Sequence, residues 1–169
     1  KAGETIILDV GANVDCRPQH LLQFAGMGYA YMQKVRGISD PTIGLLNIGT
    51  EVSKGNELTT KTYKLLEDSG WNFVGNIEGR EVFSGRANVI VCDGFVGNIV
   101  LKVAEGLAGL VLDTMMEEFA SSKVTESVGL LARSAFQRLK QNLDYTEYGG
   151  APLLGVDGVA IICHGSSDA

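Results

Sequence analysis

Short runs of aliphatic and β-branched residues alternate along the chain with longer segments whose apolar residues recur at helical spacing. The short runs predict strands at residues 5–10, 43–48, 72–77, 88–92 and 159–163. Strands that alternate with helical segments are typical of a parallel sheet covered by helices. The pattern therefore predicts an α/β fold.

The first helix is expected to be capped by Asp15, to carry Pro18 in its first turn and to end at Gly37, and the second to be capped by Asn56. A helix at 96–119 and an amphipathic segment at 124–139 are expected to form a helical hairpin, residues 96–143, that projects from the sheet or pairs with another subunit. The predicted apolar face of the first helix consists of Leu21, Ala25, Gly28, Met32 and Val35.

The composition is that of a packed, acidic globular protein. Of 169 residues, 45% are hydrophobic and 20% charged, which argues against disorder. A net charge of -6 offers no general attraction for a polyanion, so no nucleic acid partner is expected. Charged residues interrupt the apolar stretch at 99–116, which argues against a membrane span. Because the chain starts without Met, directly before a strand, we expect residues 1–169 to be a single α/β domain from a longer protein.

Glycine and small polar residues follow four of the predicted strands, at 11–13, 49–56, 93–98 and 164–167. The carboxyl ends of parallel strands share one edge of a sheet, and ligands of open α/β sheets bind there. Glycine lets the backbone approach a ligand, and backbone N–H groups at helix N-termini favour an anion. Lys54 adds a mobile positive charge. The loops thus suggest a site for phosphate or a phosphate-bearing ligand.

The candidate ligand-binding residues in these loops are Asn13, Gly49, Thr50, Ser53, Asn56, Asp93, Gly94, His164 and Ser166. The same loops would also serve as ordinary strand-to-helix turns. Neither a Walker motif nor a dinucleotide fingerprint is present to favour a nucleotide. Asp93 is expected either to cap its loop or to orient a ligand.

The cysteines and His164 are weaker indications of a functional site than the glycine-containing loops. The widely separated Cys16, Cys92 and Cys163 fit reduced thiols, and no metal site is expected because no second pair of ligands completes one. Cys92 and Cys163 end predicted strands and are expected to be small core residues. His164 precedes Gly-Ser-Ser, but the nucleophile elbow of a serine hydrolase is absent, so a structural role at a strand end is favoured.

Four strings together resemble the C-terminal half of the PlsX family of bacterial phosphate acyltransferases: LDVGANVDCRP, GLLNIGTEVSKGNE, FVGNIEGREVFSGRANVIVCDGFVGNIVLK and YGGAPLLGVDGVAIICHGSSDA. The resemblance covers essentially the whole chain. It implies a Rossmann-like three-layer sandwich, similar to that of isopropylmalate dehydrogenases, and a homodimer whose long helices meet between subunits.

The same resemblance implies a reaction of acyl-acyl carrier protein with inorganic phosphate, which yields acyl phosphate for phospholipid synthesis. Lys54 and Asn98 match functional positions of the family motifs and are the expected catalytic residues, Lys54 to hold phosphate and Asn98 to stabilise the thioester oxyanion. No cofactor is implied. Two other functions stay open: a nucleotide-dependent oxidoreductase of the related dehydrogenase fold, and a non-catalytic module for dimerisation or membrane docking.

The implied partners are the acidic acyl carrier protein, inorganic phosphate, a second copy of the chain and a glycerol-3-phosphate acyltransferase. Arg133, Arg138 and Lys140 are candidate contacts for the carrier protein, or else solvated residues of the hairpin. The family resemblance also implies a cytoplasmic protein that contacts the membrane peripherally. The stretch at 107–116 and the turn at 120–124 are the candidates for that contact, although dimer packing is the favoured role for most of their side chains.

Overall fold

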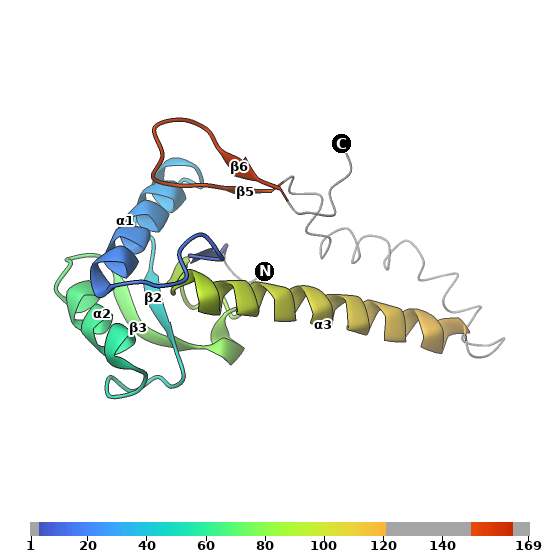
Figure 1. Ribbon diagram of the computed structural model, residues 1–169. Coiled ribbons are helices and arrows are strands. Elements are labelled where there is room, and N and C mark those ends of the chain that lie inside the picture. The colour runs from blue at the N-terminus through green and yellow to red at the C-terminus, as the bar shows by residue number, and fades with distance from the viewer. Residues whose placement is uncertain (1–3, 121–149, 164–169) are drawn as a thin grey trace. The chain divides into compact units, whose positions relative to one another are not determined.

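The computed structural model describes residues 4–120 and 150–163 (Figure 1). Its contacts divide the chain into two compact units, Lys1–Leu101 and Lys102–Ala169. The first unit holds a parallel sheet in the order β1-β4-β2-β3. Its strands are β1 Ile6–Leu8, β2 Ile43–Asn47, β3 Phe73–Glu78 and β4 Val89–Val91. The α/β prediction is confirmed for this unit, and each strand lies within one or two residues of its predicted position.

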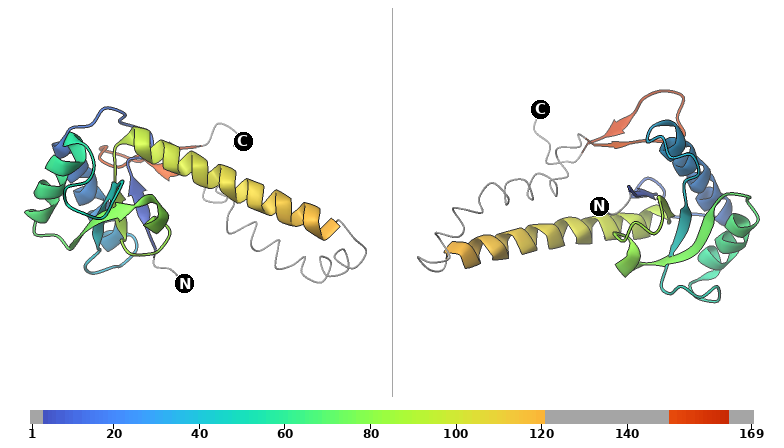
Figure 2. Two further views of the ribbon diagram at one scale, coloured as in Figure 1. Left: turned by 90° about the horizontal axis from the view of Figure 1, so that it is seen from below. Right: turned by 180° about the vertical axis from the view of Figure 1, so that it is seen from behind.

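The helices α1 (Pro18–Lys34) and α2 (Glu57–Glu67) cover one face of the sheet (Figure 2). Gly28 of α1 is essential to this packing, because a Cβ atom there would lie 2.5 Å from Cγ1 of Val89. The predicted inner face of α1 is confirmed except for Val35, which follows the last turn and is 61% exposed. The buried residues of this layer are Leu21, Phe24, Ala25, Met32, Ile43, Leu45, Leu66, Val89 and Val91.

The caps of the two helices differ in how well the sequence predicts them. Asn56 caps α2 as expected, since its Oδ1 accepts a hydrogen bond of 2.9 Å from the N–H of Thr59. The expected cap of α1 by Asp15 is wrong, because Arg17 occupies the N-cap position. A residue before proline is restricted to extended backbone, and Arg17 has φ -104° and ψ 159°. Pro18 therefore sets the start of α1.

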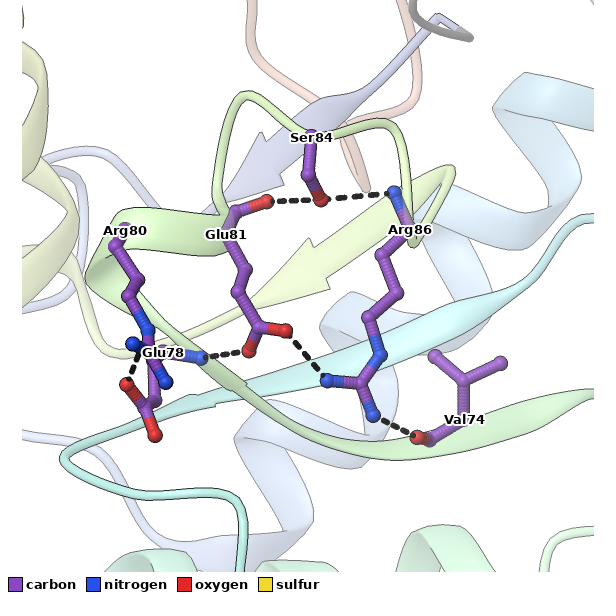
Figure 3. Close-up of polar contacts among 6 residues, drawn as sticks. All are labelled: Val74, Glu78, Arg80, Glu81, Ser84 and Arg86. Carbon is purple, nitrogen blue, oxygen red and sulfur yellow. Dashed lines mark hydrogen bonds and ion pairs between the residues drawn. The ribbon is translucent and has the colours of Figure 1, made fainter.

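The opposite face of the sheet is covered by Val100 and by the segment between β3 and β4, which includes the 3-10 helix η1 (Gly79–Glu81). Glu81 organises that segment: its carboxylate accepts hydrogen bonds from the N–H of Glu78 (3.0 Å) and from Arg86 (2.8 Å) (Figure 3). The Glu78 N–H and the Arg86 guanidinium hold the pKa of Glu81 below its ordinary value. The segment therefore has a defined path from the end of β3 to the start of β4.

The long helix α3 (Gly94–Ala120) begins in the first unit and continues into the second. Its start is two residues earlier than predicted, and the second helix of the expected hairpin lies outside the described residues. By length and composition, Gly94–Glu118 could also cross a membrane, with a mean hydropathy of 1.7. Core helices of soluble proteins share this length and composition.

The predicted strand at 159–163 does not extend the parallel sheet. It forms the short strand β6 (Ile161–Ile162), which pairs antiparallel with β5 (Ala151–Pro152) as a separate two-stranded sheet. The connection contains Gly155 and Gly158 with positive φ angles of 84° and 154°, which let the chain reverse within a few residues. A reversal of this kind pairs a strand with the segment just before it.

Candidate active site

Three of the four glycine-containing loops follow β1, β2 and β4, so they lie at the carboxyl edge of the same parallel sheet. The fourth loop, with His164 and Ser166, lies outside the described residues, and the strand before it belongs to the other sheet. The prediction that all four strands end at one edge is therefore wrong for the last one. The candidate site consists of the loops at 9–13, 48–56 and 93–98.

Asp9, which the sequence analysis did not select, organises the 9–13 loop. Its carboxylate accepts hydrogen bonds of 2.7 to 2.9 Å from the backbone N–H groups of Gly11, Ala12 and Asn13 and from the Asn13 side chain. Burial alone would raise the pKa of Asp9, but these hydrogen bonds outweigh it and lower the pKa below its ordinary value. The side-chain amide of Asn13, predicted as a ligand-binding group, is thus engaged within its own loop.

The first turn of α3 packs directly on this loop. The N–H of Gly94 donates a 2.8 Å hydrogen bond to the carbonyl of Asn13. At Gly97 a Cβ atom would lie only 1.8 Å from the carbonyl oxygen of Asp9, so glycine alone allows this approach. Asn98, a predicted catalytic residue, is exposed, and its Oδ1 lies 3.8 Å from the position a Cβ of Gly11 would take. Asn98 therefore lies beside the 9–13 loop.

Asp93 caps α3, since its Oδ1 accepts a 2.8 Å hydrogen bond from the N–H of Val96. The capping role considered for Asp93 is therefore confirmed. A carboxylate at this position is attracted by the positive end of the helix dipole. It also disfavours a second anion at the same helix terminus.

The loop from 48 to 56, named here the lysine loop, joins β2 to α2. Gly49 is buried, whereas Thr50, Ser53 and Lys54 are exposed. The stem of Lys54 crosses Gly49, where a Cβ atom would lie 2.9 Å from Cγ of Lys54. Among the described residues, the Lys54 ammonium has no ion pair or hydrogen bond. Lys54 is thus a positive charge that is available at the edge of the sheet.

A cavity of about 440 Å³, named here the edge cavity, opens between the lysine loop and the start of α3. Of the predicted site residues, Asn56 and Asp93 line this cavity. Lys54, on the lysine loop, and Asn98, on α3, adjoin it without belonging to its lining. Asp93 carries the one formal charge among the described residues that line it. The lining consists of Leu21, Leu46, Asn47, Ile48, Gly55, Asn56, Thr59, Gly79, Cys92, Asp93, Val96 and Val100.

The thiol of Cys92 in this lining is poorly suited to act as a nucleophile. Burial, reinforced by the nearby Asp93 and Asp9 carboxylates, raises its pKa to about 12. A neutral thiol is a weak nucleophile near neutral pH. The expectation that Cys92 is a core residue is confirmed, but the same expectation for Cys163 is wrong, because Cys163 is exposed after β6. No cluster that could hold a metal ion occurs among the described residues.

A family model described as fatty acid synthesis protein matches residues 1–169. The chain therefore belongs to the fatty acid synthesis protein family. It is 57% identical over 167 residues to a phosphate acyltransferase of Pelotomaculum thermopropionicum, which covers 99% of this chain and 49% of the relative. A phosphate acyltransferase of Moorella thermoacetica is 55% identical over 168 residues, again 99% of this chain and 49% of the relative.

A third relative, a phosphate acyltransferase of Geobacter sulfurreducens, is 53% identical over 166 residues, which is 98% of this chain and 48% of the relative. The chain thus spans about half the length of the curated relatives it matches. The names of these relatives describe acyltransferases, and the family model describes fatty acid synthesis. They do not favour the oxidoreductase or the non-catalytic module that the sequence analysis left open.

Proposed function

We propose that the protein of which this chain is a part transfers the acyl group of acyl-acyl carrier protein to inorganic phosphate. A phosphate oxygen attacks the thioester carbonyl carbon, the C–O bond forms as the C–S bond breaks, and the carrier-protein thiolate takes up a proton from solvent. Acyl phosphate and free carrier protein are the products. The acyl phosphate then serves a glycerol-3-phosphate acyltransferase in phospholipid synthesis.

The observation that carries this proposal is the arrangement of the lysine loop and the first turn of α3 on either side of the edge cavity. Lys54 has an ammonium available for phosphate, and the exposed Thr50 and Ser53 hydroxyls of the same loop add neutral hydrogen bonds. Phosphate is already anionic near neutral pH, so it needs position and desolvation more than a strong base. Asn98 is proposed as the donor to the thioester oxyanion.

The edge cavity is proposed to receive the uncharged part of the thioester substrate. Its lining includes aliphatic side chains from β2 and α3, such as Leu46, Val96 and Val100. Asp93 repels an anion from the cavity, which favours phosphate at the lysine loop outside it. An acyl chain is apolar and gains about 0.8 kcal/mol for each methylene that is removed from water.

The experiment that tests this function is phosphate-dependent release of carrier-protein thiol by the full-length protein. We expect Lys54→Ala and Asn98→Ala each to lower kcat/KM on the order of 100-fold, because each removes a group that positions or stabilises charge in the transition state. Lys61→Ala is the matched control, since Lys61 pairs with Glu57 on the surface of α2. Unchanged rates in both site variants would show that the site is elsewhere.

We further propose a cytoplasmic, Rossmann-like enzyme of the isopropylmalate dehydrogenase-like type that functions as a homodimer and contacts the membrane peripherally. The parallel order β1-β4-β2-β3 supports the fold. Apolar side chains of α3 support a further contact, because Val103, Leu107 and Leu110 are 62%, 57% and 63% exposed. Sedimentation of the full-length protein with and without lipid vesicles separates dimer formation from membrane binding.

The carrier-protein contact is proposed for Arg133, Arg138 and Lys140, which lie outside the described residues. Basic side chains would complement an acidic partner and speed its association at low salt. We expect the triple Glu variant to raise KM for acyl-acyl carrier protein while KM for phosphate stays the same.

A further inference from the structure

Two asparagine side chains anchor the backbone around Lys54, Asn47 directly and Asn76 through Glu51. The N–H of Lys54 donates to the carbonyl of Glu51 at 3.1 Å, and Asn76 Nδ2 donates to the same oxygen at 2.9 Å. The carbonyl of Lys54 accepts a hydrogen bond of 3.1 Å from Asn47 Nδ2. Both main-chain polar groups of Lys54 are thereby tied, directly or through Glu51, to side chains of the sheet.

Asn47 also closes the lysine loop on itself. Its Oδ1 accepts a 2.8 Å hydrogen bond from the N–H of Ile48, so one amide joins the first residue of the loop to Lys54. Gly55 makes room for this amide: it has a φ of 98°, and a Cβ atom there would lie 2.5 Å from Asn47 Oδ1. The amide of Asn47 at the end of β2 therefore sets the conformation of the loop.

The position of Asn76 is one where a side-chain amide lowers the free energy of unfolding. It lies on β3 opposite Leu45 of β2, it is 1% exposed, and its Oδ1 has no hydrogen-bond partner among the described residues. A buried acceptor without a partner costs folding free energy that an apolar side chain of similar shape would avoid. The benefit that accounts for an amide here is its hydrogen bond to the carbonyl of Glu51, within the lysine loop.

We propose that Asn76, together with Asn47, is a positioning residue that holds the Lys54 backbone where its ammonium meets phosphate. This inference rests on the proposed role of Lys54. Asn76 is buried and acts through Glu51 and Lys54 rather than on the substrate. A loop that is already ordered before phosphate binds loses less conformational entropy on binding.

The test is Asn76→Leu in the full-length protein, with steady-state kinetics and the melting temperature Tm as readouts. We expect KM for phosphate to rise on the order of tenfold, with KM for acyl-acyl carrier protein unchanged. We expect Tm to be unchanged or higher, because the variant removes the unpartnered Oδ1 while Glu51 still accepts the N–H of Lys54. A residue with a merely structural role would lower Tm and leave KM for phosphate alone.

Asn88→Leu is the matched control. The amide of Asn88 also bridges two segments, with Oδ1 accepting from the N–H of Thr42 and Nδ2 donating to the carbonyl of Glu4, but at the amino edge of the sheet. We expect this variant to lower Tm without changing KM for phosphate. If it raises KM for phosphate as much as Asn76→Leu does, the effect is not specific to the lysine loop and the inference is wrong.

A double-mutant cycle with Lys54→Ala separates this inference from the proposed function. If Lys54→Ala alone has no effect, the role of Lys54 is wrong. If Lys54→Ala impairs phosphate use but Asn76→Leu does not, only the positioning role is wrong. We expect Asn76→Leu to add little in the Lys54→Ala background, because both changes affect the same group. Should Asn76→Leu fail to fold, Asn47→Ala at a half-buried position tests the same rise in KM for phosphate, although Asn47 also lines the edge cavity and KM for acyl-acyl carrier protein is then not a control.

Discussion

At the residue scale, Asp9 is the side chain on which the 9–13 loop depends, and its charge can be tested by pH. The carboxylate accepts four N–H hydrogen bonds, and we expect Asp9→Asn to lower the free energy of unfolding by about 2 kcal/mol at pH 7. Because folding lowers the pKa of Asp9, its stabilisation is complete above the unfolded-state pKa of about 3.9. It is lost as the pH falls through the lower folded-state pKa.

The measurement for Asp9 is urea unfolding of the full-length wild type and the variant at pH 7 and near pH 3. The difference in unfolding free energy between the two proteins is expected to shrink at the lower pH, because pH 3 lies below the unfolded-state pKa of about 3.9 and the unfolded wild type then binds a proton at Asp9. A difference that stays constant between these pH values would mean that Asp9 stabilises the loop without its charge.

The sequence indicates some site residues better than others for a physical reason. Asn56 and Asp93 precede helices in short-range patterns, and both cap a helix as a capping rule predicts. The sequence does not reveal the roles of Asp9, Asn47 and Asn76. Each of these side chains forms hydrogen bonds to a loop that folds back on it. Asn76 illustrates this: it bonds to Glu51, 25 residues earlier, and only the pairing of β3 with β2 brings the two together.

At the scale of the elements, the start of α3 is set by its close approach to the 9–13 loop. We expect Gly97→Ala to lower the unfolding free energy by about 3 kcal/mol, because the new Cβ would meet the Asp9 carbonyl oxygen and backbone must move. The variant is also expected to lose activity, since it displaces Asn98. Denaturant unfolding and the thiol-release assay measure the two effects.

Gly106→Ala in the same helix is the control for Gly97→Ala. Nothing lies within 4 Å of a Cβ at Gly106, so the substitution is expected to stabilise α3 by about 0.5 to 1 kcal/mol through helix propensity. Equal destabilisation by both variants would mean that the close approach of Gly97 to Asp9 is not the reason why a Cβ atom at position 97 is unfavourable.

The sequence predicts the helices and strands whose pattern of apolar residues is set by their own contacts with the core. Periodicity located the four strands of the parallel sheet and the inner face of α1, because the apolar residues of each belong to the buried core or pack against it. It failed at β6, whose two isoleucines are exposed and pair with Ala151–Pro152 across a glycine-rich turn. An apolar run alone does not reveal whether a strand joins a large sheet or a local hairpin.

At the scale of the whole molecule, the site adjoins two chemically different surfaces. The lysine loop presents an available cation, whereas the edge cavity beside it is mainly aliphatic and carries Asp93. An acyl transfer to phosphate needs both surfaces, because one substrate is a small anion and the other brings an apolar chain. The chain spans about half the length of the curated relatives it matches.

The edge cavity can be tested as the acyl site by filling it. Val96 lines the cavity and is 39% exposed, so Val96→Phe adds volume there with little disturbance of the core. We expect kcat/KM for long acyl chains to fall about tenfold, since two displaced methylenes forfeit roughly 1.6 kcal/mol, while short acyl chains and KM for phosphate are unaffected. Val35→Phe, at the far end of α1, is the control. A uniform loss across chain lengths would place the acyl chain outside the cavity.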